Sequence, residues 1–131
     1  MTQYIKKAFI TGAAKGLGRA TAVALSASGY KTILTDVDPV ELAETQKIIE
    51  DAGGSAVSYL LDVSDKKQIE SVLVQAIKDE KKIDAFVNNA GIGGKMAPFH
   101  EMKDEDWDKV IAVNLSSVFY CLKFQLKITT P

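Results

Sequence analysis

The sequence predicts an α/β protein built on a doubly wound parallel sheet, and two observations lead to this prediction. Apolar runs of strand length alternate with longer stretches in which apolar residues recur at helical spacing, as in βαβ units. In addition, a length of 131 residues, with 47% hydrophobic and 25% charged residues, is typical of one globular domain. Residues 1–131 are therefore expected to form a single domain, with helices covering both faces of the sheet.

Short apolar runs that end at polar or glycine-containing segments are typical of strands. Four such runs stand at 8–10, 32–35, 56–61 and 84–87. One helix is expected to end at Gly29, and a second to run from Pro39 to Gly53, since proline suits a first helical turn. A third helix follows Asp65, in a segment that offers capping side chains. The last segment, from about Lys103, is expected to form one or two helices.

Charge and composition exclude several classes of protein. Lysine and arginine are interleaved with aspartate and glutamate and the net charge is −1, so no nucleic-acid partner is expected. The longest apolar stretch, 110–119, contains Asn114 and falls short of the roughly twenty residues that span a bilayer, so no membrane span is expected. Cys121 has no cysteine partner and the first residues do not resemble a secretory signal, so the cytoplasm is the expected compartment.

The first strand leads into a glycine-rich loop from Thr11 to Gly18, with glycines at 12, 16 and 18. A loop that binds a diphosphate must turn tightly out of the strand, bring its backbone close to the phosphates and open a helix whose N-terminal N–H groups face them. Glycine suits these tasks because it tolerates positive φ and has no side chain to collide. Taken alone, such a loop is also compatible with a tight connection and no ligand.

An acidic residue, Asp36, closes the second predicted strand. In dinucleotide-binding Rossmann folds an acid about twenty residues beyond the glycine loop binds the adenosine ribose hydroxyls. The loop and Asp36 together predict a nicotinamide dinucleotide site. A carboxylate at this place repels the 2′-phosphate of NADP, so NAD is the expected cofactor and NADP the less favoured one.

Two motifs in order make the chain resemble the short-chain dehydrogenase/reductase family. The first is the glycine motif of Thr11, Gly12, Gly16 and Gly18, and the second is Asn-Asn-Ala-Gly at 88–91. The resemblance implies a Rossmann-like sheet in the order 3-2-1-4. It also implies cofactor contacts by Thr11, Gly12, Lys15, Gly16, Leu17, Gly18, Asp36, Asp62, Val63, Asn88, Ala90 and Gly91. Asn114 matches the family's helix asparagine, which implies a catalytic role in placing a proton-relay lysine through water.

Several of these residues also have purely structural interpretations. Asp62 is placed to cap the next helix, the Asn88-Asn89 pair suits a plain turn, and Asn114 suits a solvated helix position. Lys15 is either a solvated loop cation or a mark of NADP use, since family members that use NADP often carry a basic residue before the second glycine. His100, the only histidine, has no surrounding acids or cysteine arranged for a metal, so no metal site is expected.

The family's catalytic residues are not found in this sequence. The resemblance implies a serine and a Tyr-x-x-x-Lys pair, in which the lysine lowers the phenol pKa so that tyrosine can exchange a proton. None of the four tyrosines has lysine at that interval, and Tyr120 with Lys123 has the wrong spacing. The chain therefore resembles the N-terminal half of the family, with an ending at Pro131 that looks like an interruption, and is not expected to be catalytic alone.

Two functions are compatible with these motifs. The first is the cofactor-binding part of an oxidoreductase that transfers hydride between NAD(H) and a small alcohol or carbonyl substrate. The second is a non-catalytic nucleotide-binding or protein-interaction module. In both, a fourth strand without its next neighbour and an uncovered apolar helix face favour association into homo-oligomers.

Overall fold

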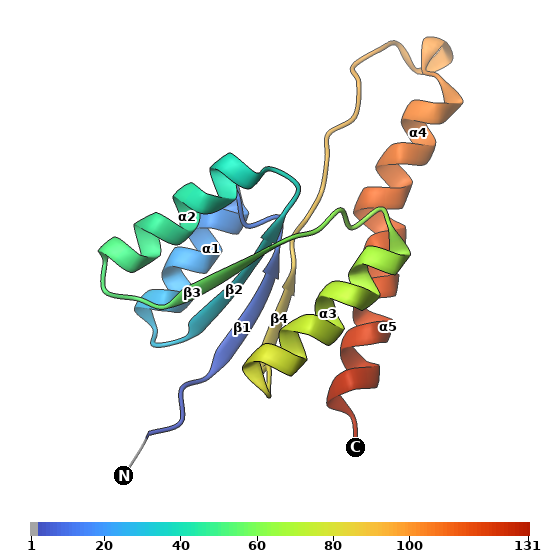
Figure 1. Cartoon of the computed structure of the whole chain (residues 1–131). Helices are drawn as coiled ribbons and strands as arrows, with labels where there is room; N and C mark the ends of the chain where they lie inside the picture. Colours follow the sequence, from blue (N-terminus) through green and yellow to red (C-terminus); the bar gives the residue numbers. More distant parts are fainter. Residues whose placement is uncertain (1–2) are drawn as a thin grey trace.

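Four parallel strands form the centre of the computed structural model, which describes residues 3–131 (Figure 1). The strands are β1 (Lys7–Thr11), β2 (Lys31–Asp36), β3 (Ala56–Leu60) and β4 (Ala85–Asn88). They pair in the order β3-β2-β1-β4, all in parallel, which confirms the predicted topology. Because the chain moves from β1 to β2 on one side and reaches β4 on the other, the strand order reverses at β1.

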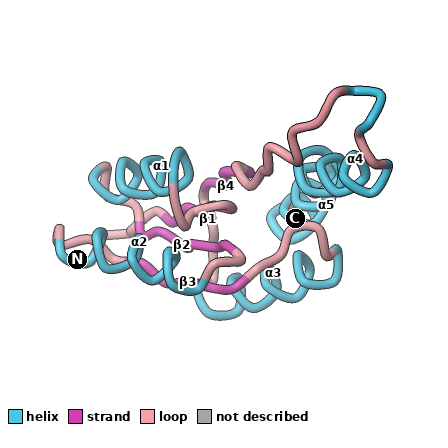
Figure 2. The backbone as a smooth tube through the Cα atoms, turned by 90° about the horizontal axis from the view of Figure 1, so that it is seen from above, coloured by secondary structure: helices cyan, strands magenta, loops and turns pink. Residues whose placement is uncertain are grey.

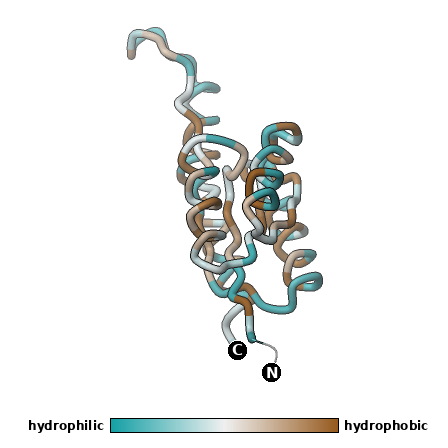
Figure 3. The backbone as a smooth tube through the Cα atoms, turned by 90° about the vertical axis from the view of Figure 1, so that its left-hand side faces the viewer, coloured by the Kyte–Doolittle hydropathy of each residue, from teal (hydrophilic) through white to brown (hydrophobic). Residues whose placement is uncertain are grey.

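Helices cover both faces of the sheet, as predicted. In Figure 1, α1 (Gly16–Ala27) and α2 (Pro39–Asp51) lie on one side of the strands, and α3 (Lys66–Glu80) and α5 (Ser117–Thr129) lie on the other. Hydrophobic and hydrophilic residues alternate along these helices (Figure 3), as expected where one helix face packs on a sheet. Among residues 3–131 no helix combines the length and apolar composition needed to cross a bilayer.

The core consists of two layers because successive strand side chains point to opposite faces. Phe9 and Ile33 pack with residues of α3 and α5 on one face. Ile10 and Leu34, the next residue of each strand, pack with residues of α1 and α2 on the other. Each central strand is therefore buried on both sides, which explains its continuous apolar run.

Aspartates fix the starts of two helices. Asp38 accepts hydrogen bonds from the backbone N–H groups of Val40 and Glu41, both at 3.1 Å, directly before the expected start at Pro39. Asp65 caps α3 in the same way. The capping interpretation of Asp62 is therefore wrong, and its carboxylate is left for another role.

The C-terminal segment is one continuous helical run with an irregular centre. It consists of α4 (Asp104–Ile111), a π-helical turn η2 (Ala112–Ser116) and α5, and it follows a short 3₁₀ turn η1 (Phe99–Glu101). Seen from above, the loop from β4 to η1 reaches far from the sheet before the chain returns along α4 (Figure 2). The π turn contains Asn114 and divides the two helices that the sequence left unresolved.

Candidate functional site

A cleft of about 700 Å³ opens at the carboxyl ends of the strands, next to the reversal at β1. In open α/β sheets this is the position at which ligands bind. The lining residues come from the glycine loop and the start of α1, the segments after β2, β3 and β4, and the helical run of α4 and η2. They are Gly12, Lys15, Leu17, Asp36, Val37, Asp38, Leu61, Asp62, Val63, Ser64, Asn89, Ala90, Gly91, Ile92, Lys109 and Val113.

The glycine loop packs its backbone against the segment after β4. A Cβ atom on Gly18 would lie 1.8 Å from the Gly12 carbonyl oxygen, and one on Gly12 would lie 2.9 Å from the Ala90 Cα. Gly12 and Gly16 also have φ values of 66° and 58°, which other residues rarely adopt. Gly12 and Gly18 are thus required by close packing, whereas a Cβ on Gly16 would meet no atom within 4 Å.

The tip of α1 presents an uncapped N-terminus beside the cleft. Lys15 precedes the helix and its side chain makes no capping hydrogen bond. The N–H groups of a first helical turn have no partner within the helix and carry partial positive charge. With no side chain on Gly16, this end of the helix is open to an anion.

Two acidic side chains line the cleft from neighbouring strand ends. The Asp36 carboxylate accepts hydrogen bonds from Ala14 N (3.0 Å) and Val37 N (2.7 Å), so the backbone orients it. Asp62 accepts from the Ser64 N–H at 3.0 Å and the Ser64 hydroxyl at 2.7 Å. Both carboxylates are held by short local contacts and retain acceptor capacity toward the cleft.

The Asn-Asn-Ala-Gly segment joins β4 to the rest of the molecule. The Thr11 hydroxyl oxygen accepts from the N–H groups of Asn89 and Ala90, each at 3.0 Å. Asn89 Nδ2 also contacts the Gly12 carbonyl at 3.2 Å. Asn88 turns away from the cleft and exchanges two amide hydrogen bonds with Gln125 of α5, at 3.0 and 2.7 Å.

Asn114 is bound to the segment that follows this motif. Its Oδ1 accepts from the Ile92 N–H and its Nδ2 donates to the Ile92 carbonyl, both at 2.8 Å. The side-chain amide therefore satisfies both the backbone N–H and the backbone C=O of Ile92, as the backbone of a neighbouring strand would. This double contact ties the π turn to the wall of the cleft.

Eight of the residues predicted to contact the cofactor line one cleft: Gly12, Lys15, Leu17, Asp36, Asp62, Val63, Ala90 and Gly91. The remaining predicted residues do not line it: Thr11 and Asn88 end strands β1 and β4, Gly16 and Gly18 lie in the first turn of α1, and Asn114 lies in η2. Sequence reasoning missed the other half of the lining, including Lys109 and Val113. Their spacing of four residues, directly before Asn114, is the signal that places both on one helix face.

Two tyrosines and the cysteine outside the cleft have raised pKa values. A hydrogen bond to Asp84 raises the pKa of Tyr4, and burial together with a hydrogen bond to Asp79 raises the pKa of Tyr59. Burial raises the pKa of the Cys121 thiol to about 11. A proton-exchanging phenol requires the opposite shift. Across residues 3–131, no group of three or more His, Cys, Asp or Glu side chains is arranged to hold a metal.

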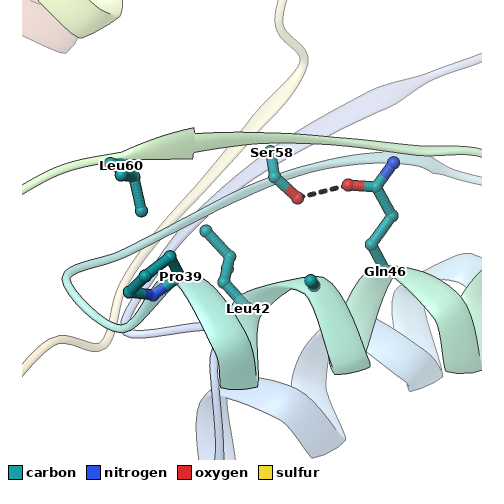
Figure 4. Close-up of a pocket in the computed structure, with 6 residues that line it drawn as sticks. Pro39, Leu42, Gln46, Ser58 and Leu60 are labelled. Atoms are coloured by element: carbon teal, nitrogen blue, oxygen red, sulfur yellow. Dashed lines mark hydrogen bonds between the residues drawn. The ribbon is translucent and has the colours of Figure 1, made fainter.

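A second, smaller pocket of about 220 Å³ lies between α2 and β3 (Figure 4). Leu42 and Leu60 line it, and the Ser58 hydroxyl donates to Gln46 Oε1 at 2.5 Å within it. The pocket contains none of the predicted cofactor residues and no ionisable side chain. The larger cleft is therefore the candidate site.

Comparison with known proteins agrees with this geometry. The short chain dehydrogenase family matches residues 6–128. The chain belongs to this family. Among its relatives, levodione reductase of Leifsonia aquatica is 42% identical over 121 residues, which cover 91% of this chain and 45% of that protein. The chain thus spans about half the length of the relatives it matches.

Two solved structures of family members are similar in fold. A metagenomic short-chain oxidoreductase in complex with NADP matches with a TM-score of 0.87 and 35% identity, over 91% of this chain and 54% of that one. Carveol dehydrogenase of Mycobacterium avium in complex with NAD matches with a TM-score of 0.86 and 30% identity, over 93% and 48%. Both nicotinamide cofactors thus occur among these short-chain dehydrogenases.

The packing of the glycine loop predicts how much stability the protein loses when each glycine is replaced by alanine. Gly18→Ala forces a Cβ into the Gly12 backbone, whereas Gly16→Ala adds only the strain of a positive φ, about 1–2 kcal/mol. In urea unfolding, the free energy of unfolding should therefore be highest for the unsubstituted chain, lower for Gly16→Ala and lowest for Gly18→Ala. Equal losses for the two variants would contradict the packing described above.

Proposed function

We propose that the chain binds a nicotinamide dinucleotide in the cleft, as the cofactor-binding part of a short-chain dehydrogenase/reductase. The observation that carries this proposal is that the bare tip of α1 and the Asp36 carboxylate border one cleft at the strand reversal. The helix tip suits a diphosphate, and Asp36, which accepts from the Ala14 N–H of the same loop at 3.0 Å, suits the hydroxyl groups of the ribose next to it. The adenosine half of a nicotinamide dinucleotide carries both groups side by side.

The residues present fit such a ligand. The Gly16 backbone, without a side chain, and the first-turn N–H groups would receive the diphosphate, with Lys15 adding positive charge. The Asp36 carboxylate would accept hydrogen bonds from the ribose hydroxyls. Asp62 and Val63 would border the adenine, and Ala90 and Gly91 would lie beside the cofactor at the end of β4.

NAD is the proposed cofactor. Asp36 presents a negative charge where NADP would bring its 2′-phosphate, and Asp38 lines the same part of the cleft. Lys15 is the opposing feature, since a cation at this place would favour NADP. Across the whole cleft, three carboxylates (Asp36, Asp38 and Asp62) outnumber two ammonium groups (Lys15 and Lys109), and this charge favours NAD.

The bound cofactor would supply or accept hydride in a reaction with a small alcohol or carbonyl substrate. For that reaction Asn114, fixed by Ile92, would contribute a positioned backbone and amide beside the cleft. The sequence contains no Tyr-x-x-x-Lys pair, and the pKa values of Tyr4 and Tyr59 are raised. The proposal is therefore binding of the dinucleotide by this chain without turnover.

The cofactor preference is tested at Asp36. Asp36→Asn removes the charge but keeps an oxygen that can accept from Ala14 N–H, so the loop should stay in place. Isothermal titration should show NADH binding more tightly than NADPH to the unsubstituted chain. In the variant this preference should fall at least about tenfold, on the order of 1.4 kcal/mol. Tighter binding of NADPH to the unsubstituted chain would reverse the assignment.

Catalysis is tested by mixing the chain with NADH and a panel of ketones, aldehydes and sugars. Binding should be visible by titration, while the absorbance of the reduced nicotinamide should stay constant, because the general acid that would protonate the product is missing. Steady loss of that absorbance would reveal a catalytic group in this chain. Absence of any NADH binding would overturn the proposed function as a whole.

A second candidate function is supported by an exposed apolar surface that begins at Leu115 in η2 and continues along α5. Leu115, Phe119, Leu122 and Leu126, here called the α5 stripe, are 64%, 61%, 46% and 61% exposed and follow one another at helical spacing. An apolar row of this kind favours pairing with the same row of a second copy. The chain is accordingly also proposed to act as a self-associating interaction module.

Self-association is tested at the centre of the α5 stripe. Phe119→Asp should weaken the dimer about tenfold or more, because burial of a phenylalanine contributes roughly 1.5–3 kcal/mol. Val40→Asp on α2, an apolar residue with 75% exposure outside the stripe, serves as the matched control. Sedimentation over a wide concentration range would measure both. A chain that stays monomeric throughout would rule out this second function.

A further inference from the structure

A buried threonine of α2 contacts the glycine loop from behind. Thr45 has no exposed surface. Its hydroxyl oxygen lies 2.9 Å from the Ala13 carbonyl oxygen and 3.1 Å from that of Ala14. Thr45 does not line the cleft, and it belongs to none of the sequence motifs. Its contacts therefore bear on the shape of the loop and not on a ligand directly.

Arg19 of α1 fixes the direction in which this hydroxyl donates. Arg19 Nε donates to the Thr45 oxygen at 2.9 Å, and Nη2 donates to the Glu41 carboxylate at 2.8 Å and to its carbonyl at 3.1 Å. The guanidinium group thus occupies one acceptor position of the hydroxyl. The single hydroxyl hydrogen is directed to the carbonyls around it, of which the Ala13 oxygen is nearest.

The peptide that accepts from Thr45 also donates to Asp36. In a trans peptide the C=O and N–H groups point in opposite directions. The peptide between Ala13 and Ala14 accepts from Thr45 at its carbonyl, and at its N–H it donates to Asp36 Oδ2 at 3.0 Å. This one peptide therefore contacts both the buried hydroxyl and the acid that lines the cleft. The other carboxylate oxygen of Asp36 accepts from the Val37 N–H at 2.7 Å, a contact that does not involve Thr45, so Asp36 should keep its place when the Thr45 hydroxyl is lost.

The next peptide leads to the helix tip. Its carbonyl, that of Ala14, faces Thr45, so the N–H of Lys15 points away from α2. A peptide turned the other way would direct a carbonyl oxygen, with its partial negative charge, away from α2 and toward the place proposed for the phosphates. The Thr45 hydroxyl opposes that orientation because it offers a donor only on the α2 side.

We propose that Thr45, held by Arg19, is a positioning residue that sets the peptide orientation of the glycine loop for diphosphate binding. The inference rests on the proposed function, and it concerns one part of the ligand. Thr45 supports the site that receives the diphosphate, whereas adenosine is held by the Asp36 and Asp62 end of the cleft. Loss of the hydroxyl should therefore weaken binding of diphosphate ligands selectively.

The test compares two ligands by NMR titration: ADP-ribose, which contains the diphosphate, and adenosine, which does not. Thr45→Val should weaken ADP-ribose about tenfold, since a buried carbonyl loses its donor, and should leave adenosine within about twofold. Thr45→Ser should restore ADP-ribose affinity. If the variant bound both ligands equally more weakly, a general loss of structure would explain the result and the positioning role would be overturned. Unchanged binding of both ligands would overturn it as well.

A matched control and a second variant complete the test. Thr32 is equally buried, but its hydroxyl has no hydrogen-bond partner among the described residues, so Thr32→Val should bind both ligands as the unsubstituted chain does. Should Thr45→Val fail to fold, Arg19→Met decides instead: a selective loss for ADP-ribose supports the inference, and any other result overturns it. If the unsubstituted chain binds neither ligand, the proposed function itself is overturned, an outcome distinct from the loss of selectivity that would overturn only the role of Thr45.

Discussion

The structure depends on one close approach of backbone to backbone, where the glycine loop meets the segment after β4. Gly12 and Gly18 leave no room for a Cβ atom, and Asn89 closes the contact with hydrogen bonds to the loop carbonyls. This contact holds the segments that follow β1 and β4 together, and residues of both segments line the cleft. The placement of α1, the orientation of Asp36 and the course of the chain after β4 all follow from it.

Much of this arrangement could be predicted from the sequence because it depends on local chemistry. Continuous apolar runs identified the strands, and the proline at the start of α2 identified its first turn. The glycine motif and Asp36 belong to one strand–helix–strand unit whose geometry is nearly constant. For these residues, position in the sequence is sufficient to fix position in space.

The remaining parts of the site depend on contacts between distant residues with ordinary types. Thr45 occupies a helix position where many side chains would serve, and only the packing of α2 against the loop gives its hydroxyl a function. Lys109 is one cation among many in the chain, until the course of α4 brings it to the cleft. The direction taken by Asn88 likewise follows from Gln125, a partner that no local pattern indicates.

The π turn has a geometric consequence for the long C-terminal helix. One additional residue in a turn rotates everything beyond it by about 100° relative to a regular α-helix. Lys109 lies before this change of phase and the α5 stripe begins within it, so the two halves of the helix present faces that a regular helix would not combine. A single helical run can thus border the cleft near one end and expose an apolar row of side chains toward the other.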